Sequence, residues 1–171
     1  MPILCGIASE TYSCAPSPIQ WAAITAYESV ESNEEYLNNE RKVLSRIGNF
    51  VANTLQSAGI HCLNPVGGFY VMPNFDPIRE KIATKGIHTS QQLCSQILVD
   101  TGVAILPGNA FGFGDHYLTA RLAFVDFSGE DILRAIEQKG LQIVEEEDFI
   151  QTHAPNIYEG IMRLSQWIQQ C

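Results

Sequence analysis

One arginine lies in the middle of an otherwise apolar segment. Tyr117-Leu-Thr-Ala-Arg-Leu-Ala-Phe-Val125 has the pattern of a β-strand, in which successive side chains point to opposite faces of a sheet. One face would be apolar, and it carries Leu118, Ala120, Leu122 and Phe124. Arg121 lies on the other face, and a charge among so many apolar residues needs an anionic partner. Its planar guanidinium suits a bidentate carboxylate, which belongs either to a ligand or to one of the 19 acidic residues.

A glycine-rich segment comes shortly before this strand. Pro107-Gly-Asn-Ala-Phe-Gly-Phe-Gly114 contains three glycines in eight residues, and glycine permits positive φ and close approach of the backbone to a ligand. It is not a phosphate-binding P-loop, because no Gly-Lys-Ser/Thr follows. The segment is therefore either a ligand-binding loop or a plain connection between two strands. Gly67-Gly-Phe-Tyr70 could similarly place an aromatic ring against a ligand, although core packing would also explain both rings.

Metal and hydrolase chemistry find no support in the sequence. The four histidines are isolated, with no partner at metal-ligand spacing, so we expect no metal site. No serine lies in a Gly-x-Ser-x-Gly elbow. The five cysteines are odd in number and scattered, which favours reduced thiols in a cytoplasmic protein over a disulfide framework.

Length and charge narrow the class of protein further. A chain of 171 residues with 46% apolar and 17% charged residues is typical of one globular domain, or of one domain plus a docking element. The formal charge of −9 argues against nucleic acids and anionic membrane surfaces as partners. No stretch approaches the roughly 18 apolar residues that a membrane-spanning helix needs.

Two helices are expected in the first third of the chain. Ser17 and Pro18 are typical of a helix start, and the apolar run Ile19–Tyr27 predicts a helix buried on all sides. Ser32 and Glu35 have the spacing of a capping box that would begin a second helix of about six turns. Such a long helix, directly after a buried one, suggests a rod that links two packing environments.

The rest of the chain alternates between short strands and helices. Strands are expected at 60–63, 68–72, 103–106 and 117–125, and helices at about 76–85, 90–101, 128–140 and 155–170. Thr89 and Ser128 would cap two of these helices. The pattern predicts an α/β (α+β) fold with about four strands, covered by the helices at 90–101 and 128–140.

Four segments, taken in order, resemble the C-terminal region of the class I/II, fold-type I, pyridoxal-phosphate-dependent aminotransferases. They are Ser9-Glu-Thr-Tyr-Ser-Cys-Ala-Pro-Ser-Pro-Ile-Gln20, Gly67-Gly-Phe-Tyr-Val-Met-Pro-Asn-Phe75, Thr101-Gly-Val-Ala-Ile-Leu-Pro-Gly-Asn-Ala-Phe-Gly112 and Tyr117-Leu-Thr-Ala-Arg-Leu-Ala-Phe124. The first resembles the entry to the family's interdomain helix. The resemblance implies the small C-terminal domain of such an enzyme at residues 32–171, with a helical tail. Residues 1–31 would then be the end of the large domain and the interdomain helix region.

The resemblance also implies roles for three residues. Arg121 matches the arginine that binds the substrate α-carboxylate, Tyr70 matches an aromatic position at the substrate pocket, and Asn109 lies in a loop near the same site. The implied substrates are an amino acid and a 2-oxo acid, and the implied assembly of the parent protein is a homodimer.

The chain departs from the family in what it lacks. The family forms an internal aldimine through a lysine in a Ser-Lys segment, followed by a phosphate-binding arginine, upstream of everything matched here. The chain has four lysines, Lys42, Lys81, Lys85 and Lys139, and none of them lies in such a context. The family's aspartate that pairs with the pyridinium nitrogen also belongs to the missing part. We therefore expect no catalytic or cofactor-binding residue here, no pyridoxal phosphate bound to this chain alone, and no activity without the missing groups. The alternative is a stand-alone, non-catalytic α/β domain that acts as a protein-interaction module.

Overall fold

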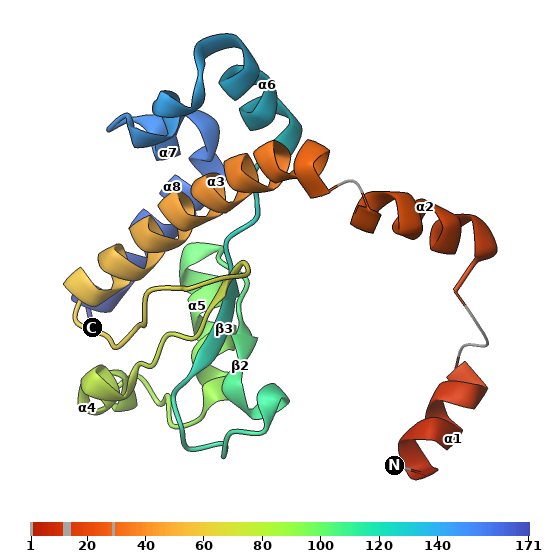
Figure 1. Ribbon diagram of the computed structural model, residues 1–171. Coiled ribbons are helices and arrows are strands. Elements are labelled where there is room, and N and C mark those ends of the chain that lie inside the picture. The colour runs from red at the N-terminus through yellow and green to blue at the C-terminus, as the bar shows by residue number, and fades with distance from the viewer. Residues whose placement is uncertain (1, 12–14, 29) are drawn as a thin grey trace. The chain divides into compact units, whose positions relative to one another are not determined.

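The computed structural model describes residues 2–11, 15–28 and 30–171 (Figure 1). Its contacts divide the chain into two compact units, Met1–Asn38 and Asn39–Cys171, which we call the N-terminal unit and the C-terminal unit. No helix in the described residues is long and apolar enough to cross a membrane.

The N-terminal unit contains α1 (Pro2–Thr11), α2 (Ser17–Glu28) and the first residues of α3 (Val30–Ser57). The helix expected after Ser17 is present, but the prediction that it is buried was wrong, because α2 has no buried residue and Trp21 is 72% exposed. An all-round apolar helix is buried only where partner surfaces surround it. The helix expected to begin at Ser32 already begins at Val30, so the predicted cap lies inside α3.

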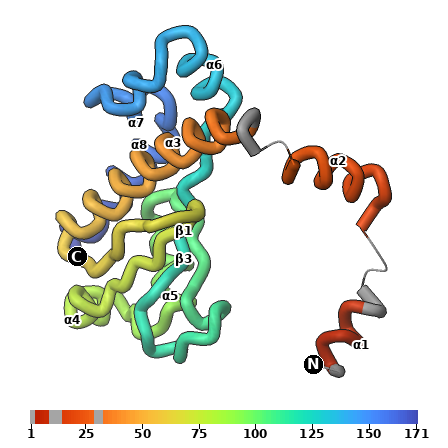
Figure 2. The backbone as a smooth tube through the Cα atoms, in the orientation of Figure 1, coloured from red at the N-terminus to blue at the C-terminus, as the bar shows by residue number. Residues whose placement is uncertain are grey.

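The C-terminal unit holds the remaining elements, and Figure 2 follows the backbone through them to the C-terminus. After α3 they are β1 (Tyr70–Val71), η1 (Asp76–Ile78), α4 (Arg79–Ala83), α5 (Ser90–Thr101), β2 (Leu106–Pro107), η2 (Gly108–Phe111), β3 (Ala120–Ala123), α6 (Gly129–Lys139), η3 (Leu141–Glu145), α7 (Phe149–His153) and α8 (Pro155–Gln169). The predicted helices at 90–101, 128–140 and 155–170 are confirmed to within a residue or two at each end.

The sheet has three strands in the order β1-β3-β2, and both pairs are antiparallel. The prediction of about four strands was wrong, because in the segment at 60–63 only His61 forms a bridge, to Asn74. The strands are also shorter than expected. Pro73 follows β1 and Pro107 lies within β2, and proline has no N–H to extend a ladder of hydrogen bonds.

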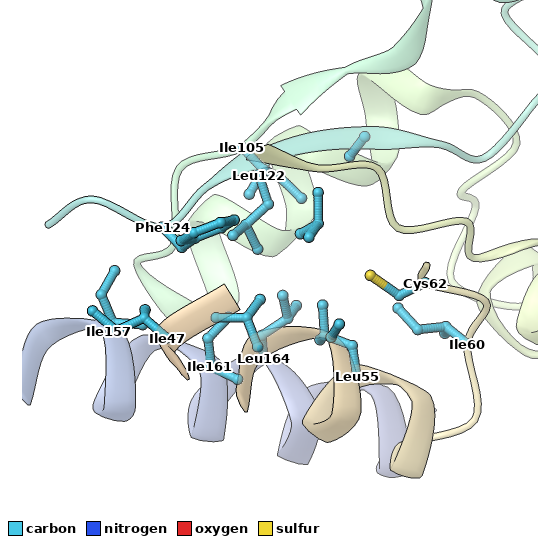
Figure 3. Packing of buried hydrophobic residues seen from close by; sticks show 14 of the residues in the cluster. Ile47, Leu55, Ile60, Cys62, Ile105, Leu122, Phe124, Ile157, Ile161 and Leu164 are labelled. Carbon is cyan, nitrogen blue, oxygen red and sulfur yellow. The ribbon is translucent and has the colours of Figure 1, made fainter. Parts of the chain in front are cut away.

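The core lies on one face of this sheet. The apolar face predicted for 117–125 is confirmed, since Leu118, Ala120, Leu122 and Phe124 are each at most 3% exposed. The alternation is broken at Thr119, which belongs to the other face and is 7% exposed. Figure 3 shows that Leu122 and Phe124 face side chains of α3 and α8, among them Ile47 and Leu164. The expected contact of α5 with the sheet is made through β2, whereas α6 packs against η3, so the prediction that 128–140 covers the sheet was wrong.

Local caps explain why α5 and α6 begin where they do. Thr89 accepts a hydrogen bond from the backbone of Gln92, whose side chain in turn accepts from the backbone N–H of Thr89, which completes a capping box. Ser128 accepts from the backbone N–H of Asp131 at the start of α6. Gly102, with φ of 75°, ends α5 in the left-handed conformation that favours glycine. Helix α5 is therefore held at both ends, and it supports the glycine-rich loop described next.

Candidate functional site

Arg121 lies at the centre of the sheet, on the face of β3 opposite the core. Its register partner is Leu106 of β2, and the next residue on the same face, Ala123, is opposite Tyr70 of β1. The guanidinium carbon lies 4.4 Å from the centroid of the Tyr70 ring and 4.4 Å from that of the Phe111 ring. The structure thus brings Arg121 together with Tyr70, and it adds Phe111, which the sequence analysis did not select.

The face of the sheet that carries Arg121 is open, although it is mostly apolar. Tyr70 is 41% exposed and Leu106 is 48% exposed. Ala123 and Val125 are also exposed on the same side of β3, and Arg121 itself is half-buried. An exposed apolar surface of this kind is typical of a binding site. Arg121 is the charged group at its centre.

The guanidinium of Arg121 has no ion pair or hydrogen bond with any residue that the structure describes. Three other arginines use their N–H groups to bind acidic side chains of the same chain. Arg79 binds Asp76, Arg134 binds Glu130, and Arg163 binds Glu159. Within the described ranges, therefore, none of the chain's own acidic residues is the internal ion-pair partner of Arg121 that the sequence allowed. The guanidinium N–H donors of Arg121 are available to a carboxylate from elsewhere.

Asn109 lies in η2, and its side chain faces its own loop. Its Nδ2 donates a hydrogen bond to Oδ1 of Asp115 at 2.9 Å, and its backbone N–H donates to Oγ of Ser90 at 3.4 Å. Ser90 in turn donates its backbone N–H to the carbonyl of Asp115 at 3.0 Å. Across the described ranges no hydrogen bond joins Asn109 to Arg121 or Tyr70. In this geometry Asn109 holds the loop on α5, and its amide is bound to Asp115.

Gly108 allows the loop to approach β3 closely. Its N–H donates to the carbonyl of Thr119 at 2.8 Å, and a Cβ at this position would lie 2.0 Å from Thr119 Oγ1 and 3.0 Å from the Thr119 carbonyl oxygen. A backbone atom cannot rotate away, so a side chain here would push the loop off the strand. The glycine is required by contact with β3, whereas Gly112, with φ of 86°, ends η2 in the left-handed conformation.

We expect Gly108→Ala to lower the free energy of unfolding by about 1–3 kcal/mol, the usual cost of overpacking a close contact. Gly129→Ala is the matched control, because a Cβ there meets no atom within 4 Å and the residue lies in the first turn of α6. Urea denaturation monitored by circular dichroism measures both. Equal midpoints for the two variants would show that the loop does not need to lie this close to the strand.

The lysines of the chain do not provide a site for an aldehyde cofactor. All four are exposed. Lys85 has recorded contacts, with its ammonium 3.3 Å from Sγ of Cys171 and 5.4 Å from the centroid of the Trp167 ring. In the described part of the chain, no contact connects a lysine to Arg121, Tyr70 or Asn109. These residues do not by themselves fit pyridoxal phosphate, which is held covalently by a lysine enclosed in its pocket.

A cavity of about 570 Å³ lies elsewhere, between α5 and α8. Its lining includes Asp100, whose pKa is lowered by hydrogen bonds from Gln96 and from the indole N–H of Trp167. Arg121 and Tyr70 are not in its lining. Lys85 and Trp167 also line it, but the Lys85 ammonium contacts Sγ of Cys171 and the Trp167 indole N–H binds Asp100. Because Arg121 keeps its N–H donors unpaired, the chemistry favours the face of the sheet that carries Arg121 as the site.

Cysteines and metal ligands add no second candidate. Cys62 and Cys94 are buried, which raises the pKa of each thiol to about 11 and leaves both protonated at neutral pH. A protonated thiol is a poor nucleophile. Among the residues that can be described, no group of three or more His, Cys, Asp and Glu side chains could hold a metal ion. Cys14 lies outside the described residues.

Comparison with known proteins gives a family match over most of the chain. The profile described as "Aminotransferase class I and II" matches residues 3–138. The "Probable aspartate/prephenate aminotransferase" of Rhizobium leguminosarum bv. phaseoli is 32% identical over 114 residues, which are 65% of this chain and 28% of that protein. The "Aspartate aminotransferase" of Geobacillus stearothermophilus is 32% identical over 111 residues, 64% of this chain and 27% of that protein. The chain thus matches about 28% of the length of such relatives.

Solved structures show the same fold. A crystal structure of an aminotransferase from Mycobacterium tuberculosis has a TM-score of 0.59 at 23% identity, and the match covers 96% of this chain and 34% of that one. The aspartate aminotransferase from Rhizobium meliloti has a TM-score of 0.60 at 19% identity, covering 95% of this chain and 33% of that one. Both likenesses concern the fold, since identity is low.

Proposed function

Because this chain belongs to the aminotransferase class I and II family, we propose that it is the C-terminal part of a pyridoxal-phosphate-dependent enzyme. That enzyme would move an amino group between an amino acid and a 2-oxo acid. The observation that carries the proposal is Arg121. It is a half-buried arginine on an exposed apolar sheet face, with no carboxylate partner in the described chain.

In this proposal Arg121 binds and orients the α-carboxylate of the substrate. The guanidinium donates two parallel N–H···O bonds, which fix the plane of the carboxylate as well as its position. Orientation of this kind lowers the barrier by holding the substrate where the reacting groups meet it. Tyr70 would form one wall of the pocket, since its ring already contacts the guanidinium. Asn109 would act near the same site by holding the glycine-rich loop on α5.

The remaining parts of the proposal concern the longer enzyme. Residues 1–31 would belong to the end of the large domain and the interdomain helix region, and 32–171 to the small domain with its tail. The parent would be a homodimer, and the free thiols of Cys62 and Cys94 suit a cytoplasmic location. The reading frame gives a direct test, because we expect it to continue upstream into a segment with a Ser-Lys pair. A frame without such a segment would favour the stand-alone interaction module, which the family match over residues 3–138 disfavours.

We expect the 171-residue chain alone to retain no pyridoxal phosphate. The four lysines are exposed, and an imine on an exposed lysine is hydrolysed readily because water reaches it. The measurement is the visible absorbance after incubation with pyridoxal phosphate and gel filtration. An absorption band that survives filtration and disappears on borohydride reduction would contradict the prediction. Lysozyme treated in the same way controls for adventitious imines on surface lysines.

A further inference from the structure

Arg121 is held by aromatic rings, whereas Arg46, Arg79, Arg134 and Arg163 are held by oxygen atoms. Arg46 donates to the carbonyls of Val144 and Glu146, and Arg163 pairs with Glu159. Arg121 has instead two rings at 4.4 Å from its guanidinium carbon, and no oxygen partner in the described ranges. This difference shows how the arginine can be ordered while it stays free to bind.

A ring attracts a guanidinium through the negative potential of its face. It does not use up the N–H donors in the way that a carboxylate or a carbonyl does. A guanidinium placed over two rings is therefore restricted in orientation and partly shielded from water, yet it keeps its donors for a ligand. Less conformational entropy is then lost when an anion binds, because the side chain is already ordered.

The two rings come from the two neighbours of β3. Tyr70 lies in β1, which pairs with one edge of β3, and Phe111 lies in η2, which directly follows β2 on the other edge. The loop that carries Phe111 is fixed by the hydrogen bonds of Asn109 with Ser90 and Asp115. The position of Phe111 is thus set by the same contacts that hold the glycine-rich loop on α5.

We propose that Tyr70 and Phe111 form an aromatic clamp that orders Arg121 for carboxylate binding, with Phe111 as a positioning residue. The inference rests on the proposed role of Arg121 and adds a residue to it. The ligand class that fits is a planar carboxylate. Its two oxygens can accept hydrogen bonds from the in-plane N–H groups that the clamp leaves unpaired. A side chain at position 111 without a ring leaves Arg121 free to rotate, and carboxylate affinity falls.

The test uses this chain and acetate as the probe. The Nε–Hε resonance of Arg121, identified by its loss in Arg121→Lys, is followed by NMR during titration with sodium acetate at constant ionic strength. In the wild type we expect an upfield Hε that moves on titration. In Phe111→Leu we expect the upfield shift to shrink and the acetate Kd to rise about twofold to fivefold, as removal of one cation–π contact predicts.

Two further variants separate the clamp from a general effect on the loop. Phe113→Leu is the matched control, because Phe113 is 45% exposed in the same segment, against 39% for Phe111, and has no recorded contact with Arg121. We expect it to keep the wild-type Kd. Phe111→Tyr keeps a ring and should restore the wild-type Kd and the upfield Hε. A merely structural role of Phe111 would not move the Arg121 resonance in this way.

The outcomes distinguish the two levels of the proposal. If acetate moves the Arg121 resonance equally well in the wild type, Phe111→Leu and Phe113→Leu, the clamp is wrong while carboxylate binding by Arg121 stands. If acetate does not move it even in the wild type, carboxylate binding by Arg121 is wrong, and the clamp falls with it. Thermal melts of the variants check that each is folded, which we expect for a substitution at a ring that is 39% exposed.

Discussion

In the longer enzyme that we propose for this chain, we expect Arg121→Lys to lower kcat/KM about tenfold to a hundredfold or more. Lysine keeps the charge but loses the planar fork that binds both carboxylate oxygens at once. A charge-assisted pair of this kind contributes on the order of 1.5–3 kcal/mol, which corresponds to that loss. The structure makes the substitution informative, since no acid among the described residues pairs with Arg121 and could account for a loss of stability instead.

The measurement is steady-state kinetics with the best amino donor, beside a thermal melt. Arg134→Lys is the matched control, because Arg134 is an exposed residue of α6 that pairs with Glu130 one turn away. We expect it to leave kcat/KM unchanged. The cofactor absorbance of Arg121→Lys should equal that of the wild type, since the partner proposed for the arginine is the substrate. Activity within twofold of the wild type, or a collapsed melt with unchanged kinetics per folded molecule, would make Arg121 a structural residue.

The largest effects on stability should come from the contact between the sheet and its helices. Leu122 is 3% exposed in β3, and Ile97 is fully buried in α5. We expect Leu122→Ala and Ile97→Ala each to lower the free energy of unfolding by about 2–5 kcal/mol, because the removed methyl groups leave cavities in a packed core. Figure 3 shows the reason for Leu122, whose side chain faces α3 and α8.

Matched controls lie beside both residues. Leu98→Ala removes the same group from a residue of α5 that is 49% exposed, and Leu106→Ala does so on the open face of the sheet, where Leu106 is 48% exposed. We expect losses below about 1 kcal/mol at both controls. Urea denaturation of the 171-residue chain measures all four variants. If Leu122→Ala and Ile97→Ala also fall below about 1 kcal/mol, the register of β3 is wrong.

Phe111 shows what sequence reasoning missed at the site. The segment around it was selected for its glycines. In a glycine-rich segment, the local sequence does not indicate whether a phenylalanine ring lines a ligand site or packs in the core. Its contact with Arg121 joins residues ten positions apart through a loop that is held on α5 by Asp115 and Ser90. Only these tertiary hydrogen bonds decide where the ring points. Asn109 was selected as a site residue, and the structure shows that its side chain binds Asp115 within the loop.

Local sequence determined those features of this protein that depend on neighbouring residues. Thr89, Gly102 and Ser128 define the ends of helices because caps satisfy backbone groups within one turn. The alternation along β3 determined which face is buried and therefore that Arg121 lies on the other, since the period of a strand is two residues.

Tertiary structure decided what depends on distant surfaces. The apolar helix α2 was expected to be buried, but hydrophobicity gives a tendency to be covered and does not supply the surface that covers it. The sheet has three strands where about four were expected. A strand needs a partner in register as well as apolar residues, and residues 60–63 pair only through His61. The placement of Tyr70 and Phe111 around Arg121 likewise follows from strand order, because the two neighbours of β3 are distant in sequence and meet only when the sheet forms.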